Sequence, residues 1–374
     1  MHTPPTHPLT YWLALIRTPS LGASGVRRLL ERHGSPEMVF FAGGRGAQDL
    51  RLKDNTLAGL NAPDWAQVER DLTWLAQDDR HCITLDDARY PARLKDSKNP
   101  PTALFVWGDA DLLTLPQIAM VGSRNPTPDG ARNSFEFARF LAAQGLTITS
   151  GLAVGIDERA HRGALDAQGL TIAVCGTGLD TIYPSRHVAL ADHIVQHGGA
   201  LISEYPPGIA ARRENFPQRN RIIASLSLGV LVVEAAVASG SLITARQGRD
   251  EGREVFAIPG SIHNPLAKGC HELIKQGAKL VETAEDILTE LAPLIQLEDV
   301  PLRSKAPALA ASVRAPTTDP THQAILQQLS HAPTRMDVLV AATGLSVAEL
   351  SSTLLMLELE GKVAQTQGGL YQKL

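Results

Sequence analysis

The chain has 374 residues, 44% of them hydrophobic, and a formal net charge of −4, which is typical of a globular protein with two or three domains. This charge excludes a surface that is basic throughout, although a local groove of arginines would still suit a nucleic acid. There is no apolar run near the roughly 20 residues that span a bilayer, no signal-peptide pattern and no metal-site spacing among the three cysteines, so we expect a cytoplasmic protein without a membrane segment, metal or cofactor.

The first part of the chain, residues 1–80, is predicted to be a helical domain. Apolar residues recur at helical spacing over Leu9–Ile16, Ala23–His33 and Trp65–Leu75. The sequence Gly34-Ser35-Pro36 ends the second of these helices. Two helices joined by a glycine-containing turn can hold DNA through backbone amides, but we favour a small helical interaction domain.

From about Ile83 the pattern changes to short apolar runs, each followed by a turn and then by helical spacing. The predicted strands cover residues 118–121, 146–149, 171–174, 200–203, 229–233, 254–258 and 279–281. Alternating strands and helices predict an α/β fold over residues 81–292, with a parallel sheet covered by helices on both faces. Ligands bind such sheets at the carboxyl ends of the strands.

The rest of the chain is predicted to be a linker followed by a winged helix-turn-helix domain. Residues 293–318 are rich in Ala and Pro and indicate the linker. Residues 319–374 contain helical patterns at 321–329, 335–342 and 346–360 and then a short hairpin. The third helix has no Lys or Arg and carries Glu349, Glu358 and Glu360, so we favour contact with protein over reading of DNA.

Glycine and small hydroxyl residues follow several predicted strands, and an arginine joins them after the first. Glycine allows close approach of a phosphate, hydroxyls and amides at a helix start donate hydrogen bonds, and arginine adds a bidentate charge. We therefore expect several anion sites along one edge of the sheet. The residues are Gly122, Ser123, Arg124, Ser150, Gly151, Ser239, Gly240 and Ser241.

The strongest local positive charge lies in residues 212–221, which contain four arginines and one glutamate. Pro217 is predicted in the first turn of a helix, whose dipole attracts anions to the side chains at its start. The residues of this predicted phosphate clamp are Arg219, Asn220 and Arg221. Phe216 would either stack on a base or belong to the core, and the sequence leaves both open.

Two pairs of titratable residues, one Asp–His and one Glu–Glu, suggest catalysis, but we favour structural roles for both. Asp157 and His161 share a helix face, yet no serine or cysteine is placed to complete a triad. We expect Asp157 to accept from amides in the first turn and His161 to pack against the glycine-rich turn. Glu204 and Glu234 end strands at the same edge, where they either serve acid–base chemistry or, as we favour, orient the arginines.

Two nucleotide-binding alternatives lack their defining residues. The turn after Ser150 is not G-x-G-x-x-G, and no acid follows where a ribose partner is expected, which disfavours a dinucleotide site. The domain is also distantly similar to nucleoside-monophosphate phosphoribohydrolases, which have a Gly-Gly-x-Gly-Thr turn and a nearby catalytic glutamate. Here no glutamate follows Ser239 until Glu251.

The blocks together closely resemble the DprA family, also called Smf, of natural transformation. The match runs in order from about Tyr90 to Thr283. Besides the turns above, it includes Gly155-Ile156-Asp157, Gly178-Leu179-Asp180 with Tyr183-Pro184, Arg219-Asn220-Arg221-Ile222-Ile223-Ala224 and Gly252-Arg253-Glu254-Val255-Phe256-Ala257-Ile258-Pro259-Gly260. The resemblance implies a SAM-like helical domain, an extended Rossmann-like domain and a winged helix.

The same resemblance implies a protein that binds single-stranded DNA and is not an enzyme. Members of the family protect incoming strands, load RecA onto them against single-strand-binding protein, and form homodimers through the Rossmann-like domain. The DNA contacts that it implies here are Arg124, Arg219, Asn220 and Arg221. A basic position after Tyr183-Pro184, often lysine in relatives, would be taken by Arg186.

Overall fold

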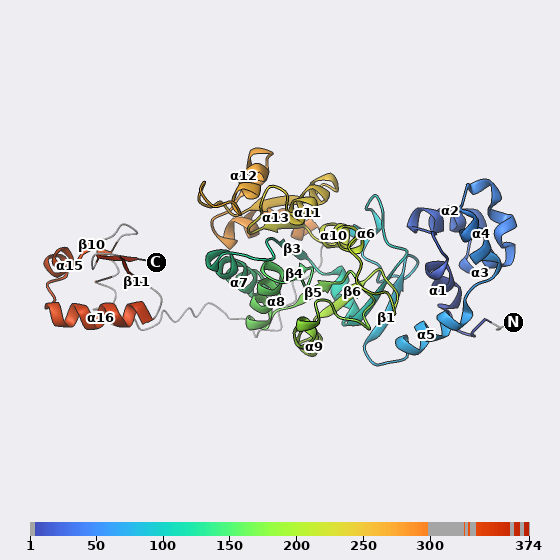
Figure 1. The fold of residues 1–374 in the computed structure, drawn as a ribbon, viewed down its shortest axis with the longest axis horizontal. Helices are drawn as coiled ribbons and strands as arrows, with labels where there is room; N and C mark the ends of the chain where they lie inside the picture. The colour runs from blue at the N-terminus through green and yellow to red at the C-terminus, as the bar shows by residue number, and fades with distance from the viewer. Residues whose placement is uncertain are drawn as a thin grey trace. The chain divides into compact units, whose positions relative to one another are not determined.

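The computed structural model describes residues 4–297, 325, 328–329, 334–359, 363–366 and 370–373. The chain divides into two compact units, residues 1–307 and 308–374 (Figure 1). Most of the predicted linker, residues 298–318, lies outside the described residues, as do Glu360 and most of the predicted helix 321–329.

The predicted start of the linker at residue 293 is wrong, because helix α13 (Ala284–Leu297) continues through Pro293. Its apolar residues explain the extension. Ile287 and Leu291 are fully buried, and Leu294 and Ile295 pack against the same core cluster. Burial of this apolar face therefore outweighs the helix-breaking tendency of an internal proline.

The helical part of the first unit has more helices than the three predicted. It consists of α1 (Thr10–Arg17), α2 (Ala23–His33), α3 (Pro36–Ala42), the 3₁₀ helix η1 (Gly44–Leu50), α4 (Asp54–Asn61) and α5 (Trp65–Leu75). Ser35 both follows the end of α2 and caps α3, since its side chain accepts a hydrogen bond from the Met38 amide. With Pro36 at the first helical position, the predicted stop is also a start signal.

A nine-stranded sheet forms the centre of the first unit, in the order β1-β2-β6-β5-β4-β3-β7-β8-β9. The seven predicted strands are present, and β3 to β9 pair in parallel. The strands are β1 (Arg80–Thr84), β2 (Ala103–Gly108), β3 (Gln117–Val121), β4 (Thr147–Ser150), β5 (Thr171–Val174), β6 (Ala200–Ser203), β7 (Gly229–Val232), β8 (Glu254–Ala257) and β9 (Lys279–Leu280). The sequence did not predict β1 and β2, which extend one edge in antiparallel pairing.

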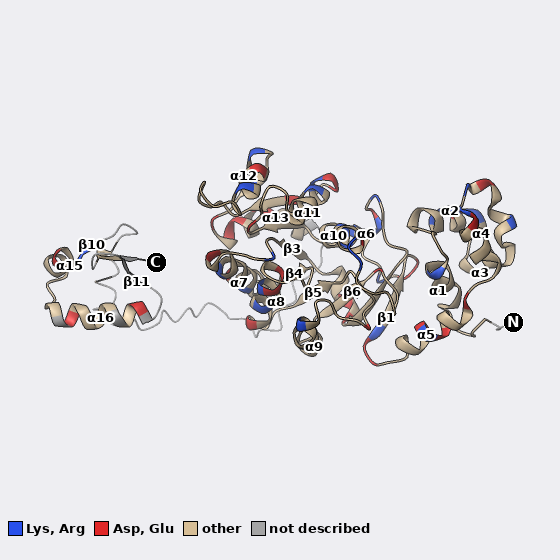
Figure 2. Ribbon diagram, viewed as in Figure 1, with Lys and Arg blue, Asp and Glu red and all other residues tan. Residues whose placement is uncertain are grey.

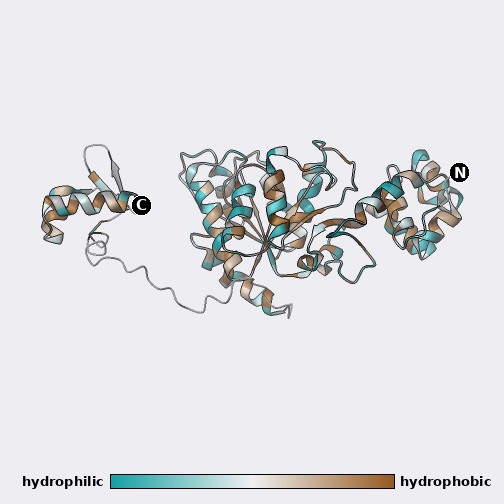
Figure 3. Ribbon diagram, turned by 90° about the horizontal axis from the view of Figure 1, so that it is seen from below, coloured by the Kyte–Doolittle hydropathy of each residue, from teal (hydrophilic) through white to brown (hydrophobic). Residues whose placement is uncertain are grey.

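Helices cover both faces of this sheet, as predicted. Side chains of α6 (Ala92–Lys95), α10 (Asn215–Leu226), α11 (Gly240–Asp250) and α12 (Lys268–Lys275) share a core cluster with one set of strand residues. The opposite set packs with α7 (Pro128–Ala143), α8 (Ile156–Asp166) and α13, and further along with α9 (Val188–Gln196). The central strands are the most hydrophobic elements in Figure 3, as expected for strands buried on both faces.

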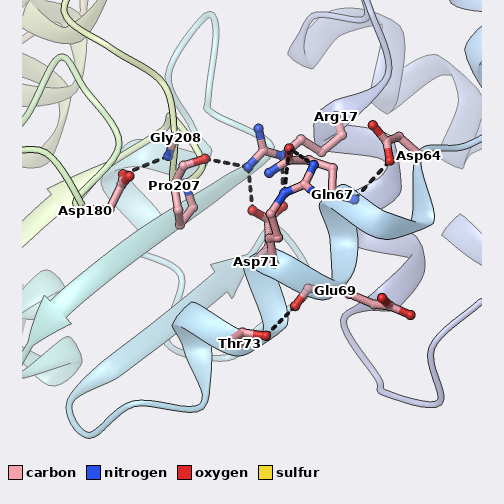
Figure 4. Close-up of polar contacts among 10 residues, drawn as sticks. Arg17, Asp64, Gln67, Glu69, Asp71, Thr73, Asp180, Pro207 and Gly208 are labelled. Carbon is pink, nitrogen blue, oxygen red and sulfur yellow. Dashed lines mark hydrogen bonds and ion pairs between the residues drawn. The ribbon is translucent and has the colours of Figure 1, made fainter.

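Arg17 at the end of α1 connects the helical part to a loop of the sheet domain (Figure 4). Its guanidinium donates to both carboxylate oxygens of Asp71 on α5 and, over 2.6 Å, to the carbonyl oxygen of Pro207. The neighbouring Gly208 amide donates to Asp180 over 2.8 Å. Burial raises the pKa of Asp71, and the hydrogen bonds from Arg17 oppose that shift.

The second unit contains the elements predicted for its end. Within the described residues these are β10 (Thr334–Arg335), α15 (Met336–Thr343), α16 (Val347–Leu359), β11 (Val363–Thr366) and β12 (Leu370–Lys373). The three strands form one antiparallel sheet in the order β10-β12-β11. A small core joins Leu339, Leu350, Leu354 and Val363.

Candidate nucleic-acid interface

One cavity at the carboxyl edge of the sheet brings together residues that the sequence places more than 100 positions apart. Its lining includes seven of the predicted site residues: Gly122, Arg124, Arg219, Asn220, Ser239, Gly240 and Ser241. Its volume is about 190 Å³. Pockets that hold a whole small molecule typically have about 300–1,000 Å³, so this cavity suits one charged group better than a complete nucleotide.

The start of α11 supplies the amides and hydroxyls on one side of this cavity. Ser239 caps the helix: its Oγ accepts from the Ser241 amide over 3.3 Å and lies 2.7 Å from the Ser241 Oγ. Gly240 is exposed at the first helical position, and a Cβ there would meet nothing within 4 Å. The positive end of the helix dipole therefore faces the cavity, as predicted for an anion site.

The turn after β3 places Arg124 at the surface beside the cavity. Arg124 is exposed and makes no ion pair with any residue that the structure describes, so its charge is available to a ligand. The turn is held from beneath by Gly155, the residue before α8, whose φ is 86°. A Cβ on Gly155 would lie 2.4 Å from the Ser123 carbonyl oxygen, so only glycine fits there.

Arg219 lies beneath the cavity instead of projecting from its helix as a free clamp residue. It is 4% exposed, and its guanidinium donates to the carbonyl oxygens of Gly151 and Val174, at 2.6 Å for Gly151. Burial lowers its pKa, and the nearby Asp157 carboxylate opposes that shift. Arg219 Nε also donates to Asn220 Oδ1 over 3.1 Å, which orients Asn220 at the cavity wall.

The prediction that Arg219 and Arg221 form one clamp is wrong. Both are on α10, where two positions correspond to about 200° of rotation, so their side chains leave the helix on nearly opposite sides. Arg221 donates to the Glu204 carboxylate and, over 2.6 Å, to the Asn99 carbonyl oxygen. It fixes the loop before β2 and does not line the cavity.

Ser150 and Gly151 are buried, so a direct contact of either with DNA is not supported. The Ser150 hydroxyl donates to the Met120 carbonyl oxygen over 2.6 Å, which ties the ends of two neighbouring strands. The Gly151 amide donates to Asp157 Oδ2 over 3.1 Å. The turn therefore shapes the floor of the site, while its own polar groups are already paired.

The acidic residues and His161 have the structural roles that we favoured, with two corrections. Asp157 accepts from the Gly151 and Ala153 amides, as expected for a role in holding the turn, although these amides precede the helix. His161 contacts β5 instead of the turn: its Nδ1 lies 2.7 Å from the Thr171 Oγ1, and burial lowers its pKa to about 3. Glu204 does orient Arg221, whereas Glu234 accepts from the Thr127 amide and hydroxyl and pairs with no arginine that the structure describes.

An aromatic pair lies close to this edge of the sheet. The ring centroids of Tyr183 and Phe216 are 5.3 Å apart, and Phe216 lies 6.0 Å from the Arg219 guanidinium carbon. Tyr183 is 50% exposed and Phe216 is half-buried, so the pair is partly core and partly available surface. Arg186 follows in the 3₁₀ helix η3 (Ser185–His187), exposed and without an ion pair in the described structure.

Lys and Arg are interspersed with Asp and Glu along the helices of the first unit in the view of Figure 2. Among the described residues, no group of three or more His, Cys, Asp or Glu side chains is placed to hold a metal ion. The cysteines Cys82, Cys175 and Cys270 are buried and free, and burial raises the pKa of each to about 12. In the same part of the chain, no helix is both long and apolar enough to span a membrane.

Comparison with known proteins identifies the family. The family described as DNA recombination-mediator protein A matches residues 81–292, which is more than half of the 374-residue chain. The chain belongs to the DprA/Smf family. The DprA winged helix domain matches residues 307–369, so the predicted family and the predicted combination of α/β and winged-helix domains are confirmed.

Individual DprA/Smf proteins are similar over most of the chain. Protein Smf of Escherichia coli (strain K12) is 46% identical over 303 residues, which cover 81% of this chain and 80% of that protein. The X-ray structure of DprA from Streptococcus pneumoniae superposes with a TM-score of 0.67 at 37% identity and covers 75% of this chain and 97% of that one. A structure describing the single-stranded DNA binding mode of DprA from Helicobacter pylori has a TM-score of 0.51 at 31% identity, covering 57% and 96%.

Proposed function

We propose that this DprA/Smf protein binds single-stranded DNA along the carboxyl edge of its sheet. The observation that carries the proposal is the cavity in which Arg124, Asn220 and the start of α11 meet. Exposed Arg124 and Arg186 supply charge for successive phosphates, and Tyr183 with Phe216 offers a surface on which a base can stack. The single-stranded DNA binding described for the Helicobacter pylori relative supports it.

The contacts that the site offers favour a single strand over a duplex. The cavity of about 190 Å³ admits one phosphate, and the pair of Tyr183 and Phe216 can stack only with a base that is not already stacked and paired in a duplex. The contacts available are amides, hydroxyls and arginines, which do not read base edges. Binding is therefore expected to have little sequence preference and to weaken with salt, because arginines displace counterions from the strand.

We expect the substitution Arg124→Ala to weaken binding of an unstructured oligonucleotide by about 1–3 kcal/mol, because a charged hydrogen bond to phosphate is lost. The slope of log binding constant against log salt concentration should also become shallower by about one unit, because one phosphate contact is lost. Fluorescence anisotropy at several salt concentrations measures both quantities.

The matched control is Arg139→Ala, an exposed arginine on α7 that pairs with Glu136 and lies outside the cavity. It should bind like the parent. Binding of duplex as tight as single strand, or parental binding by a folded Arg124→Ala variant, would contradict the proposal.

We further propose that the protein acts as a recombination mediator, protecting single strands and loading RecA onto them in competition with single-strand-binding protein, and that it works as a homodimer. The family description as a recombination mediator supports this role. Pull-down of RecA, sedimentation of the purified chain and strand-exchange assays with single-strand-binding protein would test the three parts separately.

The alternative, a nucleotide-hydrolysing enzyme, is not favoured by the geometry. Glu251 is the C-cap residue of α11, at the far end of the helix from Ser239, and its carboxylate accepts from the Lys98 amide over 3.2 Å. A catalytic glutamate would have to lie beside the cavity. Incubation with AMP and detection of free adenine tests this directly; base release at a useful rate would overturn the non-enzymatic assignment.

A further inference from the structure

Thr244 lies in the lining of the cavity and carries a hydroxyl without a hydrogen-bond partner among the described residues. It lies on α11 four residues after Gly240, which is one helical turn, or about 6 Å, below the start of the helix. Thr244 is 1% exposed, and its Oγ1 has no hydrogen-bond partner among the residues that the structure describes. Sequence reasoning did not select it, because a threonine inside a helix has no distinctive pattern.

Other threonines on helices in this protein show what Thr244 does not do. The hydroxyls of five threonines on or directly after helices donate to the carbonyl oxygen four residues earlier, at 2.7–2.9 Å, which is the usual local partner of a helical threonine, whereas those of Thr10 and Thr56 donate to the carbonyl oxygens of Pro5 and Pro19. The five pairs are Thr18 with Ala14, Thr73 with Glu69, Thr289 with Glu285, Thr343 with Leu339 and Thr353 with Glu349. The hydroxyl of Thr244 makes no such bond. A buried hydroxyl left unpaired lowers stability, so a partner from outside the chain is expected.

The groups around Thr244 define the chemistry of that partner. The start of α11 and Asn220 present donors, and Arg219 and Arg124 add positive charge below and beside them. The Asp157 carboxylate also lines the cavity, where it opposes an anion, but it is engaged by two backbone amides and lies close to Arg219. Three positive elements against one carboxylate leave a site for a compact anion.

We propose that this cavity receives a phosphate monoester, with Thr244 donating to one of its oxygens at the floor. The inference rests on the proposed function and refines it. An internal phosphodiester continues into a sugar on both sides, so it cannot descend one turn into a cavity of about 190 Å³. A terminal phosphate has one ester bond and three free oxygens, so it can reach the floor while its sugar stays outside.

A phosphate monoester can come from two sources, the end of a DNA strand or a free mononucleotide. The test therefore compares one unstructured oligonucleotide with a 5′-phosphate, a 3′-phosphate or hydroxyl ends, by anisotropy on the full chain. Displacement of each labelled strand by dAMP or by deoxyadenosine separates the sources. If dAMP displaces the phosphorylated strand, the site accepts both sources; if only phosphorylated strands compete, it requires a DNA end.

We expect one phosphorylated form to bind about tenfold tighter than the hydroxyl form, as a charge-assisted hydrogen bond of about 1.4 kcal/mol implies. Thr244→Val, which keeps the shape and removes the hydroxyl, should abolish most of this preference. Thr244→Ser should retain it. Thr18→Val, which alters another buried threonine far from the cavity, should leave the preference unchanged.

Equal binding of phosphorylated and hydroxyl-ended strands by the parent would overturn the inference and leave the proposed function standing. A preference that persists in Thr244→Val would overturn it as well. Failure of the parent to bind any of the oligonucleotides would instead contradict the proposed function. If Thr244→Val did not fold, the comparison within the parent and the Thr244→Ser variant would still decide.

Discussion

Replacing Arg219 with methionine is expected to lower the free energy of unfolding by about 3–5 kcal/mol, because it leaves the buried carboxylate of Asp157 without its positively charged neighbour. Arg219 is 4% exposed and donates to the carbonyl oxygens of Gly151 and Val174. Without it, both oxygens lose a donor, and the buried carboxylate of Asp157 loses its neighbouring positive charge. Urea denaturation followed by circular dichroism measures the loss.

The loss should depend on pH in a direction that identifies Asp157. Burial raises the pKa of Asp157 even with Arg219 present, and removing Arg219 raises it further. A carboxyl with a raised pKa in the folded state favours folding at low pH, and that contribution is lost as the pH rises through the folded-state pKa. The deficit of Arg219→Met should therefore be smallest near pH 4, around the ordinary range of aspartate, and grow toward neutral pH.

A second substitution provides the control for this prediction. Asp157→Asn removes the buried charge, so the double variant Asp157→Asn/Arg219→Met should lose less stability than the two single losses added together. Its stability should also vary less with pH over the same range. Additive losses, or a deficit that does not change with pH, would show that Arg219 acts through packing alone.

Replacing Gly155 with alanine is expected to cost about 2–4 kcal/mol of stability and to displace the turn that carries Arg124. The residue has φ 86° and ψ −122°, a region that side chains rarely adopt. The added Cβ would also lie 2.4 Å from the Ser123 carbonyl oxygen and 2.7 Å from that of Arg124. Because both contacts are with backbone, a rotamer change cannot relieve them.

Gly252→Ala separates the two contributions to this cost. Gly252 also has a positive φ, 72°, but a Cβ there would meet nothing within 4 Å. Its variant should lose only about 1–2 kcal/mol, the cost of the left-handed backbone itself, and bind DNA like the parent. Thermal unfolding and anisotropy of both variants test this. Equal losses of stability in the two variants would show that the contacts with the Ser123 and Arg124 carbonyl oxygens add no cost. Parental DNA binding by folded Gly155→Ala would show that the turn carrying Arg124 is not displaced.

The sequence predicts the parallel part of the fold well because most strands there, such as β6 and β7, are buried along their length and appear as short apolar runs. β1 has no such run, whereas β2 is itself a largely buried apolar run that sequence reasoning did not select. β1 begins Arg80-His81-Cys82, and its first two residues are only half-buried at the edge of the sheet. The antiparallel pairing of β2 with β6 joins residues more than 90 positions apart, and that of β1 with β2 joins residues 19 to 27 positions apart, so no local pattern encodes either.

The structure brings two of the predicted turns to one cavity, but it places the arginines of α10 differently from the prediction. Strand-end glycines and hydroxyls meet because carboxyl ends of parallel strands share an edge, which brings Gly122 and Ser239 to one cavity. Whether an arginine on α10 faces solvent, the sheet or a loop depends on how that helix packs. Arg219 and Arg221 look equivalent in the sequence, but one is buried under the site and the other is tied to Glu204.

The position of Arg219 changes the electrostatic character of the sheet edge. The carbonyl oxygens of Gly151 and Val174 lie at the carboxyl ends of β4 and β5, and a carbonyl oxygen left without a donor there would be unfavourable beside a phosphate. The guanidinium of Arg219 covers two of these oxygens, on Gly151 and Val174. A largely buried arginine thus removes two oxygens that would be unfavourable beside an anion and adds positive charge to the lining of the cavity. Substitutions at this position should therefore alter which ligands the edge admits, even where the fold survives.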